Sequence, residues 1–255
     1  MTPMTSSPFS LHERIALVTG ANTGLGQAIA VALAEAGADV IAVGRTAPRE
    51  TEAAVLALGR RFLAIHADLA NTDCIPATVA TALAQFGRID ILVNNAGIIR
   101  RNDAVDFTEA DWDAVVDVNL KSAFFLTQAV GRHMLQAGRG KVINIASLLS
   151  FQGGIRIASY TASKSGLAGL TRLLANEWAA KGVNVNAIAP GYFVTDNTTA
   201  LRADENRSRE ILARIPAARW GQPSDLAGAA VFLAAPASDY IHGAIIPVDG
   251  GWLAR

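Results

Sequence analysis

Seven short apolar runs alternate with longer stretches of helical composition, and this alternation limits the possible folds more than any other feature of the sequence. The runs span residues 15–19, 40–43, 62–65, 89–93, 142–146, 183–189 and 245–248. Short, continuously apolar strands separated by helices are typical of a parallel sheet that is buried on both faces. We therefore predict an α/β fold, a doubly wound sheet between two helix layers. Pro247 in the last run places that strand at an edge of the sheet.

The composition favours a single folded domain. Of the 255 residues, 51% are hydrophobic and 17% are charged, so the chain can bury a large core without disulfides or metals. No repeat, low-complexity segment or charged linker divides it. We predict a flexible N-terminal tail at residues 1–10 and one domain at residues 11–255.

The charge balance and the scarcity of metal ligands exclude several classes of function. The 22 basic and 22 acidic residues cancel and no basic run occurs, which argues against nucleic acid and anionic membranes as partners. No apolar stretch reaches the ~18 residues of a membrane span, and the N-terminus lacks the pattern of a signal peptide, so we expect a soluble cytoplasmic protein. The single cysteine, Cys74, and four scattered histidines predict neither disulfides nor a metal site.

A glycine-rich turn joins the first predicted strand to the first predicted helix. Gly20, Gly24 and Gly26 follow the spacing G-x-x-x-G-x-G. Glycine lets the backbone approach a pyrophosphate, whose charge is met by free N–H groups at the helix N-terminus. The turn therefore predicts a dinucleotide site, to which Asn22, Thr23 and Leu25 also belong.

The second strand should end near the adenosine ribose, where an acidic residue selects NAD and an arginine accommodates the 2′-phosphate of NADP. Arg45 stands at this position without a neighbouring carboxylate in the sequence, which favours NADP(H). Alternatively, Arg45 is a solvated surface residue or stacks on adenine. Asp68, with Leu69 beside it, ends the third strand, where its carboxylate could bind the adenine amino group or cap the loop.

Three further residues indicate acid–base chemistry. Tyr160 and Lys164 lie four residues apart on one face of a predicted helix, and Ser147 ends the fifth strand. Ligands of open α/β sheets bind at the carboxyl ends of the strands, so Ser147 and the glycine turn should share one crevice. We expect the Lys164 cation to lower the pKa of Tyr160, which would exchange a proton with a substrate hydroxyl positioned by Ser147.

Together these motifs resemble the short-chain dehydrogenase/reductase family, from about residue 11 to the C-terminus. The resemblance implies a Rossmann-like seven-stranded sheet, an NAD(P) cofactor, a homotetramer and a catalytic tetrad that adds Asn119 as the holder of a relay water. It also implies that Lys164 binds the nicotinamide ribose beside Tyr160. The remaining cofactor residues that it implies are Asn95, Ala96, Gly97, Pro190, Gly191, Val194 and Thr195.

Five arginines follow the fourth, fifth and sixth strands, in loops that should overhang the crevice, and a guanidinium suits a carboxylate. Any one of them could instead form a surface ion pair. We predict a small sugar-acid substrate bound by Arg101, Arg156 and Arg202, with Gln152 bonding hydroxyls and with Ser147 and Tyr160 at the reacting group. Residues 196–216 are polar and are interpreted as a mobile lid.

The loop sequences I-I-R-R and S-L-L-S-F-Q-G-G resemble a branch of the family that oxidises deoxy sugar acids in uronate catabolism. That branch commonly uses NAD, which conflicts with the NADP character of Arg45. The alternatives are a gluconate or other polyol or carbonyl oxidoreductase, an acyl-carrier-protein ketoreductase, and a cofactor-sensing protein without turnover. The last should have lost Tyr160 or Lys164, and both are present.

Overall fold

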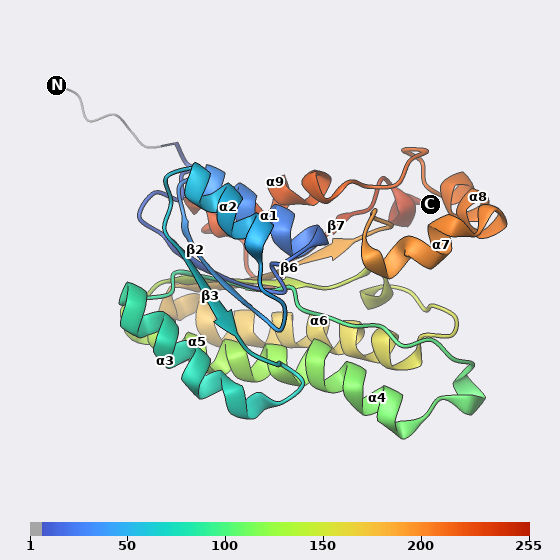
Figure 1. Cartoon of the computed structure of the whole chain (residues 1–255), viewed down its shortest axis with the longest axis horizontal. Helices are drawn as coiled ribbons and strands as arrows, with labels where there is room; N and C mark the ends of the chain where they lie inside the picture. The colour runs from blue at the N-terminus through green and yellow to red at the C-terminus, as the bar shows by residue number, and fades with distance from the viewer. Residues whose placement is uncertain (1–6) are drawn as a thin grey trace.

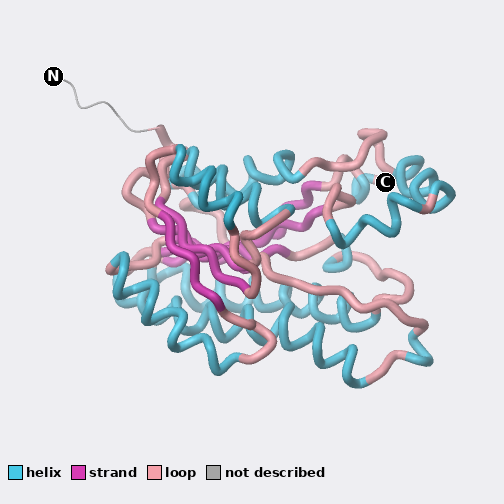
Figure 2. The backbone as a smooth tube through the Cα atoms, in the orientation of Figure 1, coloured by secondary structure: helices cyan, strands magenta, loops and turns pink. Residues whose placement is uncertain are grey.

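All seven apolar runs form parallel strands of one sheet, whose order is β3-β2-β1-β4-β5-β6-β7. The structure is a computed structural model that describes residues 7–255. Figures 1 and 2 show the strands side by side in the middle of the molecule. The strands are β1 (Ile15–Thr19), β2 (Asp39–Gly44), β3 (Phe62–His66), β4 (Ile91–Asn94), β5 (Gly140–Ile145), β6 (Val183–Pro190) and β7 (Ile245–Val248). The predicted Rossmann-like, seven-stranded, doubly wound fold is confirmed.

Helices cover both faces of the sheet. On one face lie α1 (Gly24–Glu35), α2 (Arg49–Ala57) and α9 (Pro223–Ala234), and on the other α3 (Ile75–Phe86), α4 (Glu109–Val116), α5 (Ser122–Ala137) and α6 (Ala158–Trp178) (Figure 1). Each layer buries its own apolar cluster against the sheet, which explains why the strands have few polar positions. Two short helices, α7 (Thr199–Ala203) and α8 (Glu205–Arg214), follow β6.

The sequence pattern located the strands, but several boundaries differ. The predicted run 89–93 is β4 at Ile91–Asn94, and Asp90 just before it bonds through its backbone to Ile15 and Lys141. The run 142–146 begins earlier, at Gly140, which pairs with Val183. Pro247 lies in β7, which is an edge strand as predicted.

The first described residues pack on α9 and the turn that follows it. Residues 1–6 of the predicted tail lie outside the described residues. The backbone N–H of Ala237 donates to the carbonyl of Pro8, and the Phe9 ring lies 6.4 Å from that of Phe232, so residues 7–10 contact the domain. None of the helices in the described part of the chain is long and apolar enough to cross a membrane.

The segment predicted as a polar lid is helical and partly buried. Ile211 of α8 is 2% exposed and Ile215 is 4% exposed, and both pack with Leu148 and Trp252. Because most residues of α8 are charged or polar, the sequence does not indicate that one side of this helix is apolar and buried. Residues 196–216 therefore attach to the loop after β5 and to the C-terminus.

Candidate active site

A cavity of about 640 Å³ opens at the carboxyl ends of the strands, where β1 pairs with β2 on one side and β4 on the other. This is the point at which the winding of the sheet reverses, the usual ligand site of such folds. The predicted residues that line it are Gly20, Asn22, Thr23, Gly24, Leu25, Gly26, Arg45, Asp68, Leu69, Asn95, Ala96, Gly97, Ser147, Tyr160, Lys164, Pro190, Gly191 and Thr195. The predicted site residues that do not line the cavity are Asn119, Val194, Arg101, Gln152, Arg156 and Arg202.

The glycine turn has the features of an anion site. Gly20 and Gly24 have φ of +65° and +57°, values that glycine adopts without strain. Thr23, which precedes α1, makes no side-chain capping bond, and the first turn of α1 carries no acidic residue. Free N–H groups and the positive end of the helix dipole therefore face the cavity, which fits the pyrophosphate of a dinucleotide.

Asn95 and Thr19 hold the turn in place. The Asn95 side-chain amide donates to the carbonyls of Thr19 (2.9 Å) and Gly20 (3.1 Å). The Thr19 hydroxyl in turn accepts from the backbone N–H groups of Asn95 (3.0 Å) and Ala96 (2.9 Å). These bonds join the ends of β1 and β4. Asn95 was predicted as a cofactor contact, whereas the bracing role of Thr19 was missed because nothing in the sequence pairs it with β4.

The adenosine end differs from the sequence-based expectation in one respect. Arg45 lies at the end of β2 and is 65% exposed, but its Nη1 is 4.0 Å from Oδ2 of Asp68. The expectation that no carboxylate accompanies Arg45 is therefore wrong, because the parallel pairing of β2 and β3 brings Asp68 beside it. Asp68 also caps its own loop by accepting from the N–H of Ala70 at 3.0 Å. At this distance the pair leaves the guanidinium able to turn toward a phosphate.

Ser147, Tyr160 and Lys164 meet at the inner end of the cavity. Lys164 is 4% exposed, and its Nζ donates to the carbonyl of Ile145 at 2.6 Å and lies 5.7 Å from the centre of the Tyr160 ring. Burial lowers the pKa of Lys164 from 10.5 to about 8. Burial also raises the pKa of Tyr160, opposed by a hydrogen bond with Ser147 and by the charge of Arg101. The expected lowering of the Tyr160 pKa by Lys164 is therefore wrong, because desolvation of the phenol outweighs the hydrogen bond with Ser147 and the charge of Arg101.

Asn119 occupies a single π-helical turn, Asp117–Lys121, between α4 and α5. Such turns interrupt a helix at functional sites more often than elsewhere. Its buried amide accepts from the N–H of Ile98 (2.8 Å) and donates to the carbonyl of Ile98 (2.9 Å). The side chain thus ties this turn to the loop after β4, and it is directed at the backbone rather than into the cavity.

The five loop arginines separate into two groups. Three form ion pairs: Arg100 with Asp111 (3.2 Å), Arg156 with Asp103 (3.0 Å) and Arg207 with Glu210 (2.8 Å). Surface pairing was the alternative that the sequence left open for each of them.

The other two arginines have no acidic partner among residues 7–255. Arg202 donates to the carbonyl of Thr195 and to the hydroxyls of Thr198 and Thr199, and so folds back on its own segment. Arg101 donates to the carbonyl of Asn197 at 3.0 Å, and its charge acts on the Tyr160 phenol. Arg100 lines the cavity but is paired with Asp111, whereas Arg101 lies outside the lining and has no acidic partner among residues 7–255, which leaves its charge available to a substrate anion.

Gln152 lies apart from the cavity lining. Its Oε1 accepts from Nε1 of Trp252 (3.2 Å) and from Nη2 of Arg214 (3.3 Å), and the Arg214 guanidinium lies 4.1 Å from the centre of the Trp252 ring. These contacts link the loop after Ser147 to α8 and to the C-terminus. Gln152 thus connects these segments, and its Oε1 already accepts two hydrogen bonds from protein groups rather than from a substrate hydroxyl.

Several lining residues were missed by sequence reasoning. Ile98, Val118 and Phe193 contribute apolar surface, and Asn197 and Thr198 contribute polar groups. Hydrophobic residues in loops give no distinctive signal, so only the folded arrangement locates them.

Comparison with known proteins adds to this geometry. The family model described as enoyl-(acyl carrier protein) reductase matches residues 20–253. The 2-dehydro-3-deoxy-D-gluconate 5-dehydrogenase of Escherichia coli is 61% identical over 253 residues, which covers 99% of this chain and 100% of the relative.

Two solved structures are similarly close. One, from Agrobacterium tumefaciens, is described as a 2-deoxy-D-gluconate 3-dehydrogenase with bound NADP; it is 61% identical, with a TM-score of 0.90 over 98% of this chain and 100% of the other. The other, from Beutenbergia cavernae, is described as an NAD(P)-dependent gluconate 5-dehydrogenase with bound NADP; it is 52% identical, with a TM-score of 0.94 and the same coverage.

Proposed function

Because this chain belongs to the short-chain dehydrogenase/reductase family, and is an NAD(P)-dependent oxidoreductase acting on CH–OH groups, we propose that it interconverts 2-dehydro-3-deoxy-D-gluconate and its 2,5-diketo form. The observation that carries the proposal is the position of Arg101. Its guanidinium acts on the Tyr160 phenol and has no acidic partner among residues 7–255, so it can hold the carboxylate of a sugar acid beside the reacting hydroxyl. The full-length identity to the Escherichia coli enzyme supports the same substrate.

We propose a division of roles among the four implied catalytic residues. Tyr160 exchanges the proton of the substrate hydroxyl, and Ser147 hydrogen-bonds the same oxygen. When bound, the nicotinamide cofactor supplies the hydride acceptor or donor. Lys164 binds the nicotinamide ribose and holds its ammonium group 5.7 Å from the centre of the Tyr160 ring. Asn119 fixes the π-helical turn in which it lies by bonding to Ile98, and we propose that it also holds a water that relays protons.

In oxidation the substrate carbon would lose a hydride, two electrons and one proton, to a bound nicotinamide, and the hydroxyl proton would pass to Tyr160 in its phenolate form. The raised pKa of Tyr160 keeps the phenol protonated near neutral pH, which suits proton donation in the reductive direction. The hydrogen bond with Ser147 and the charge of Arg101 oppose this rise and so favour the base form that oxidation needs.

We also propose that the enzyme accepts NADP through Arg45 and that the remaining predicted cofactor residues, Val194 included, contact the dinucleotide. NADP in two similar structures and the exposed guanidinium of Arg45 support this preference. A homotetramer in the cytoplasm completes the proposal and rests on the family resemblance.

The test compares initial rates on 2-dehydro-3-deoxy-D-gluconate, D-gluconate and an uncharged polyol. We expect rapid turnover of the first, and Arg101→Gln should raise its KM roughly tenfold or more, as expected for loss of a charged hydrogen bond, with little change for the polyol. Arg156→Gln is the matched control, since Arg156 is paired with Asp103. Equal rates on the polyol, or equal effects of both substitutions, would refute carboxylate anchoring.

Tyr160→Phe tests the chemistry itself. It should reduce kcat by roughly 10²- to 10⁴-fold, the usual contribution of acid–base catalysis, while cofactor binding persists. Unchanged turnover would remove Tyr160 from the mechanism. If D-gluconate were the fastest of the three compounds, the substrate would be the one named for the Beutenbergia cavernae protein instead.

A further inference from the structure

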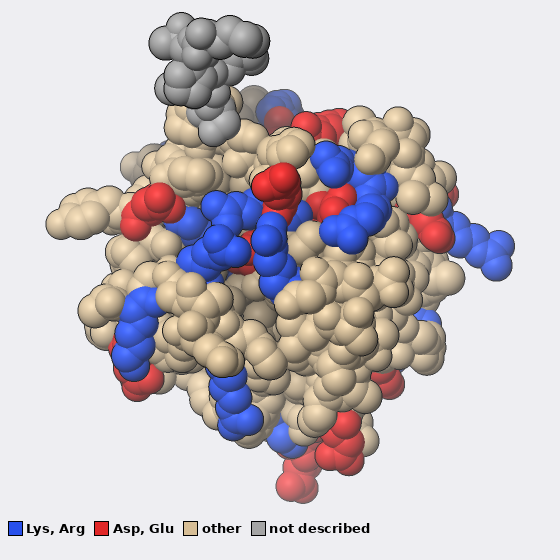
Figure 3. All heavy atoms as spheres, turned by 90° about the vertical axis from the view of Figure 1, so that its left-hand side faces the viewer, with Lys and Arg blue, Asp and Glu red and all other residues tan. Residues whose placement is uncertain are grey.

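A second cavity, of about 330 Å³, opens at the opposite edge of the sheet, where the strands begin. It lies among the starts of β4, β5 and β6 and the ends of α5 and α9, and is called the amino-edge cavity below. Figure 3 views this side of the molecule and shows Lys and Arg side chains gathered in the middle, with a few acidic ones among them. The basic residues that line the cavity are Arg14, Arg139, Lys141 and His242.

The two arginines of the cavity, Arg14 and Arg139, have guanidinium N–H groups that donate no hydrogen bond to residues 7–255. The buried Asp90 carboxylate accepts from the N–H of Ile15 and from Nε of Arg88 through Oδ2, both at 2.9 Å. Its other oxygen is 3.7 Å from Arg14 and 3.8 Å from Arg139, which is too long for a hydrogen bond. Within residues 7–255, the side chains of Arg14 and Arg139 donate no hydrogen bond. Arg88 already balances the one charge of Asp90, so two positive charges remain.

Lys141 adds a third cation, which is only 12% exposed and donates to Oδ1 of Asp239 at 2.6 Å. Burial lowers the pKa of Lys141, Asp239 opposes this effect, and the charge of Arg14 lowers the pKa further. The last effect means that Arg14 and Lys141 repel each other across the cavity. An anion between them would relieve this repulsion.

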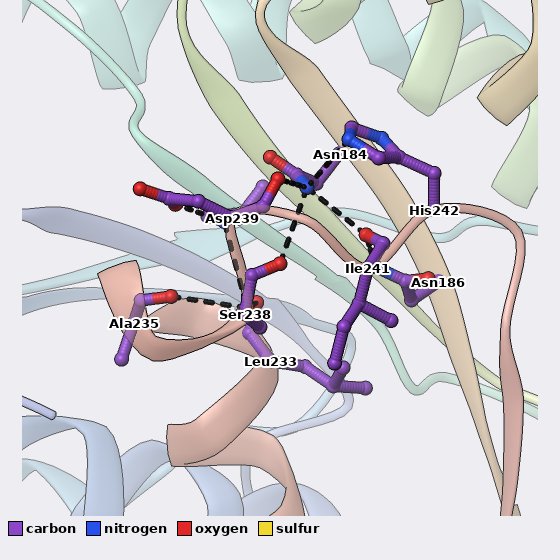
Figure 4. Close-up of polar contacts among 9 residues, drawn as sticks. Asn184, Asn186, Leu233, Ala235, Ser238, Asp239, Ile241 and His242 are labelled. Atoms are coloured by element: carbon purple, nitrogen blue, oxygen red, sulfur yellow. Dashed lines mark hydrogen bonds and ion pairs between the residues drawn. The ribbon is translucent and has the colours of Figure 1, made fainter. Parts of the chain in front are cut away.

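His242 also lines the cavity, and its ring contacts the Asn184 side chain. Figure 4 shows the Asn184 amide among the carbonyls of Ser238, Asp239 and Ile241, to which its Nδ2 donates. Nε2 of His242 lies 3.3 Å from that same Nδ2. Nδ1 of the ring is buried and has no hydrogen-bond partner in the described part of the chain.

The carboxyl ends of two helices offset part of the positive charge of the cavity, but they accept no hydrogen bond from its guanidinium groups. Gly138, which caps the carboxyl end of α5, and Ala234, the last residue of α9, both line the cavity. Each of these helix ends carries partial negative charge. However, no carbonyl of residues 7–255 accepts a hydrogen bond from Arg14 or Arg139. A ligand with several oxygens could bridge the two guanidiniums.

We propose that the amino-edge cavity binds a small multivalent oxyanion through Arg14, Arg139 and Lys141. Guanidinium groups bind phosphate and carboxylate oxygens in pairs, and the cavity has room for a molecule larger than one such group. The site lies at the edge of the sheet opposite the candidate active site, so its ligand need not be the substrate.

Isothermal titration of the full chain saturated with NADP tests the proposal, since NADP occupies the glycine turn that would otherwise take phosphate. The probes are inorganic phosphate and citrate at constant ionic strength. We expect at least one probe to bind, and Arg139→Gln and Arg14→Gln each to weaken its binding at least about tenfold, the loss of one charged hydrogen bond. Binding of phosphate alone would indicate a phosphorylated ligand, and binding of citrate alone a carboxylic acid.

Arg60→Gln is the control, because Arg60 is an arginine outside the cavity lining that is paired with Asp39. It removes the same charge and should leave binding within about twofold of the unmodified protein. Unchanged turnover in all variants would show that they fold. Failure of both probes to bind, undiminished binding in Arg139→Gln and Arg14→Gln, or an equal loss in Arg60→Gln would each overturn the proposal.

Discussion

Replacing Lys164 with methionine should stabilise the protein near neutral pH while it removes turnover. Lys164 is buried without an acidic partner among the described residues, and burial lowers its pKa from 10.5 to about 8. A tenfold change in proton affinity is worth about 1.36 kcal/mol, so keeping this lysine protonated in the folded state costs about 3 kcal/mol. Methionine has a similar length and carries no charge, so the variant avoids this cost.

The sign of the pH dependence follows from the same pKa values. Between about pH 8 and about pH 10.5 the lysine is protonated in the unfolded chain and neutral in the folded one, so the unmodified protein gains stability as pH rises. Below about pH 8 both states are protonated and the full cost applies. The loss of the hydrogen bond to the Ile145 carbonyl costs about 1–3 kcal/mol in the variant and does not depend on this titration.

Urea unfolding at about pH 7 and about pH 10.5 measures the effect. The difference in unfolding free energy between Lys164→Met and the unmodified protein should favour the variant by about 3 kcal/mol more at the lower pH. Lys181→Met is the control, because Lys181 is exposed. The reasoning is refuted if the difference is the same at both pH values, or if it favours the variant more at the higher pH.

Three further substitutions test the cofactor site, the core and the π-helical turn. Arg45→Asp should raise KM for NADP at least about tenfold and affect NAD less, because it replaces a phosphate-binding group with a repelling one; equal losses in initial-rate assays would contradict this. Gly131→Ala should lower Tm in calorimetry, at a cost of about 1–3 kcal/mol, because the new Cβ would meet the Trp178 ring at 2.5 Å; an unchanged Tm would contradict this. Asn119→Ala should destabilise the fold by about 1–3 kcal/mol by leaving the Ile98 N–H and carbonyl unpaired, and urea unfolding with no loss would contradict this.

The sequence predicted the strands because apolar runs in a buried parallel sheet have almost no polar interruptions. It also predicted which loops meet, since the carboxyl ends of parallel strands lie at one edge. It could not predict the partners of individual charges. The Arg45–Asp68 pair and the arginine–acid pairs of the substrate loops join residues that are brought together only by strand register and loop conformation.

Electrostatic balance was the other aspect that sequence reasoning misjudged. Spacing alone indicates that Lys164 is near Tyr160, and the structure places the ammonium 5.7 Å from the ring centre. The net effect on Tyr160 depends on how completely the pair is removed from water, which is a property of the packed site. The positions of the catalytic candidates were thus predictable from sequence, whereas their protonation behaviour was not.

The amino-edge cavity shows that the same topological rule applies at both edges of the sheet. Parallel strands gather their starting points as strictly as their ends, so residues that precede β1, β4 and β5 must lie near one another. Arg14, Arg88 and Arg139 occupy those positions, separated by long stretches of chain, and they surround a single carboxylate. A scan for runs of basic residues misses such a cluster, because it is assembled by the winding of the sheet and its excess positive charge is balanced by acidic residues elsewhere in the chain, whose net charge is zero. Grouping charged residues by strand start as well as by strand end would have located it from the sequence.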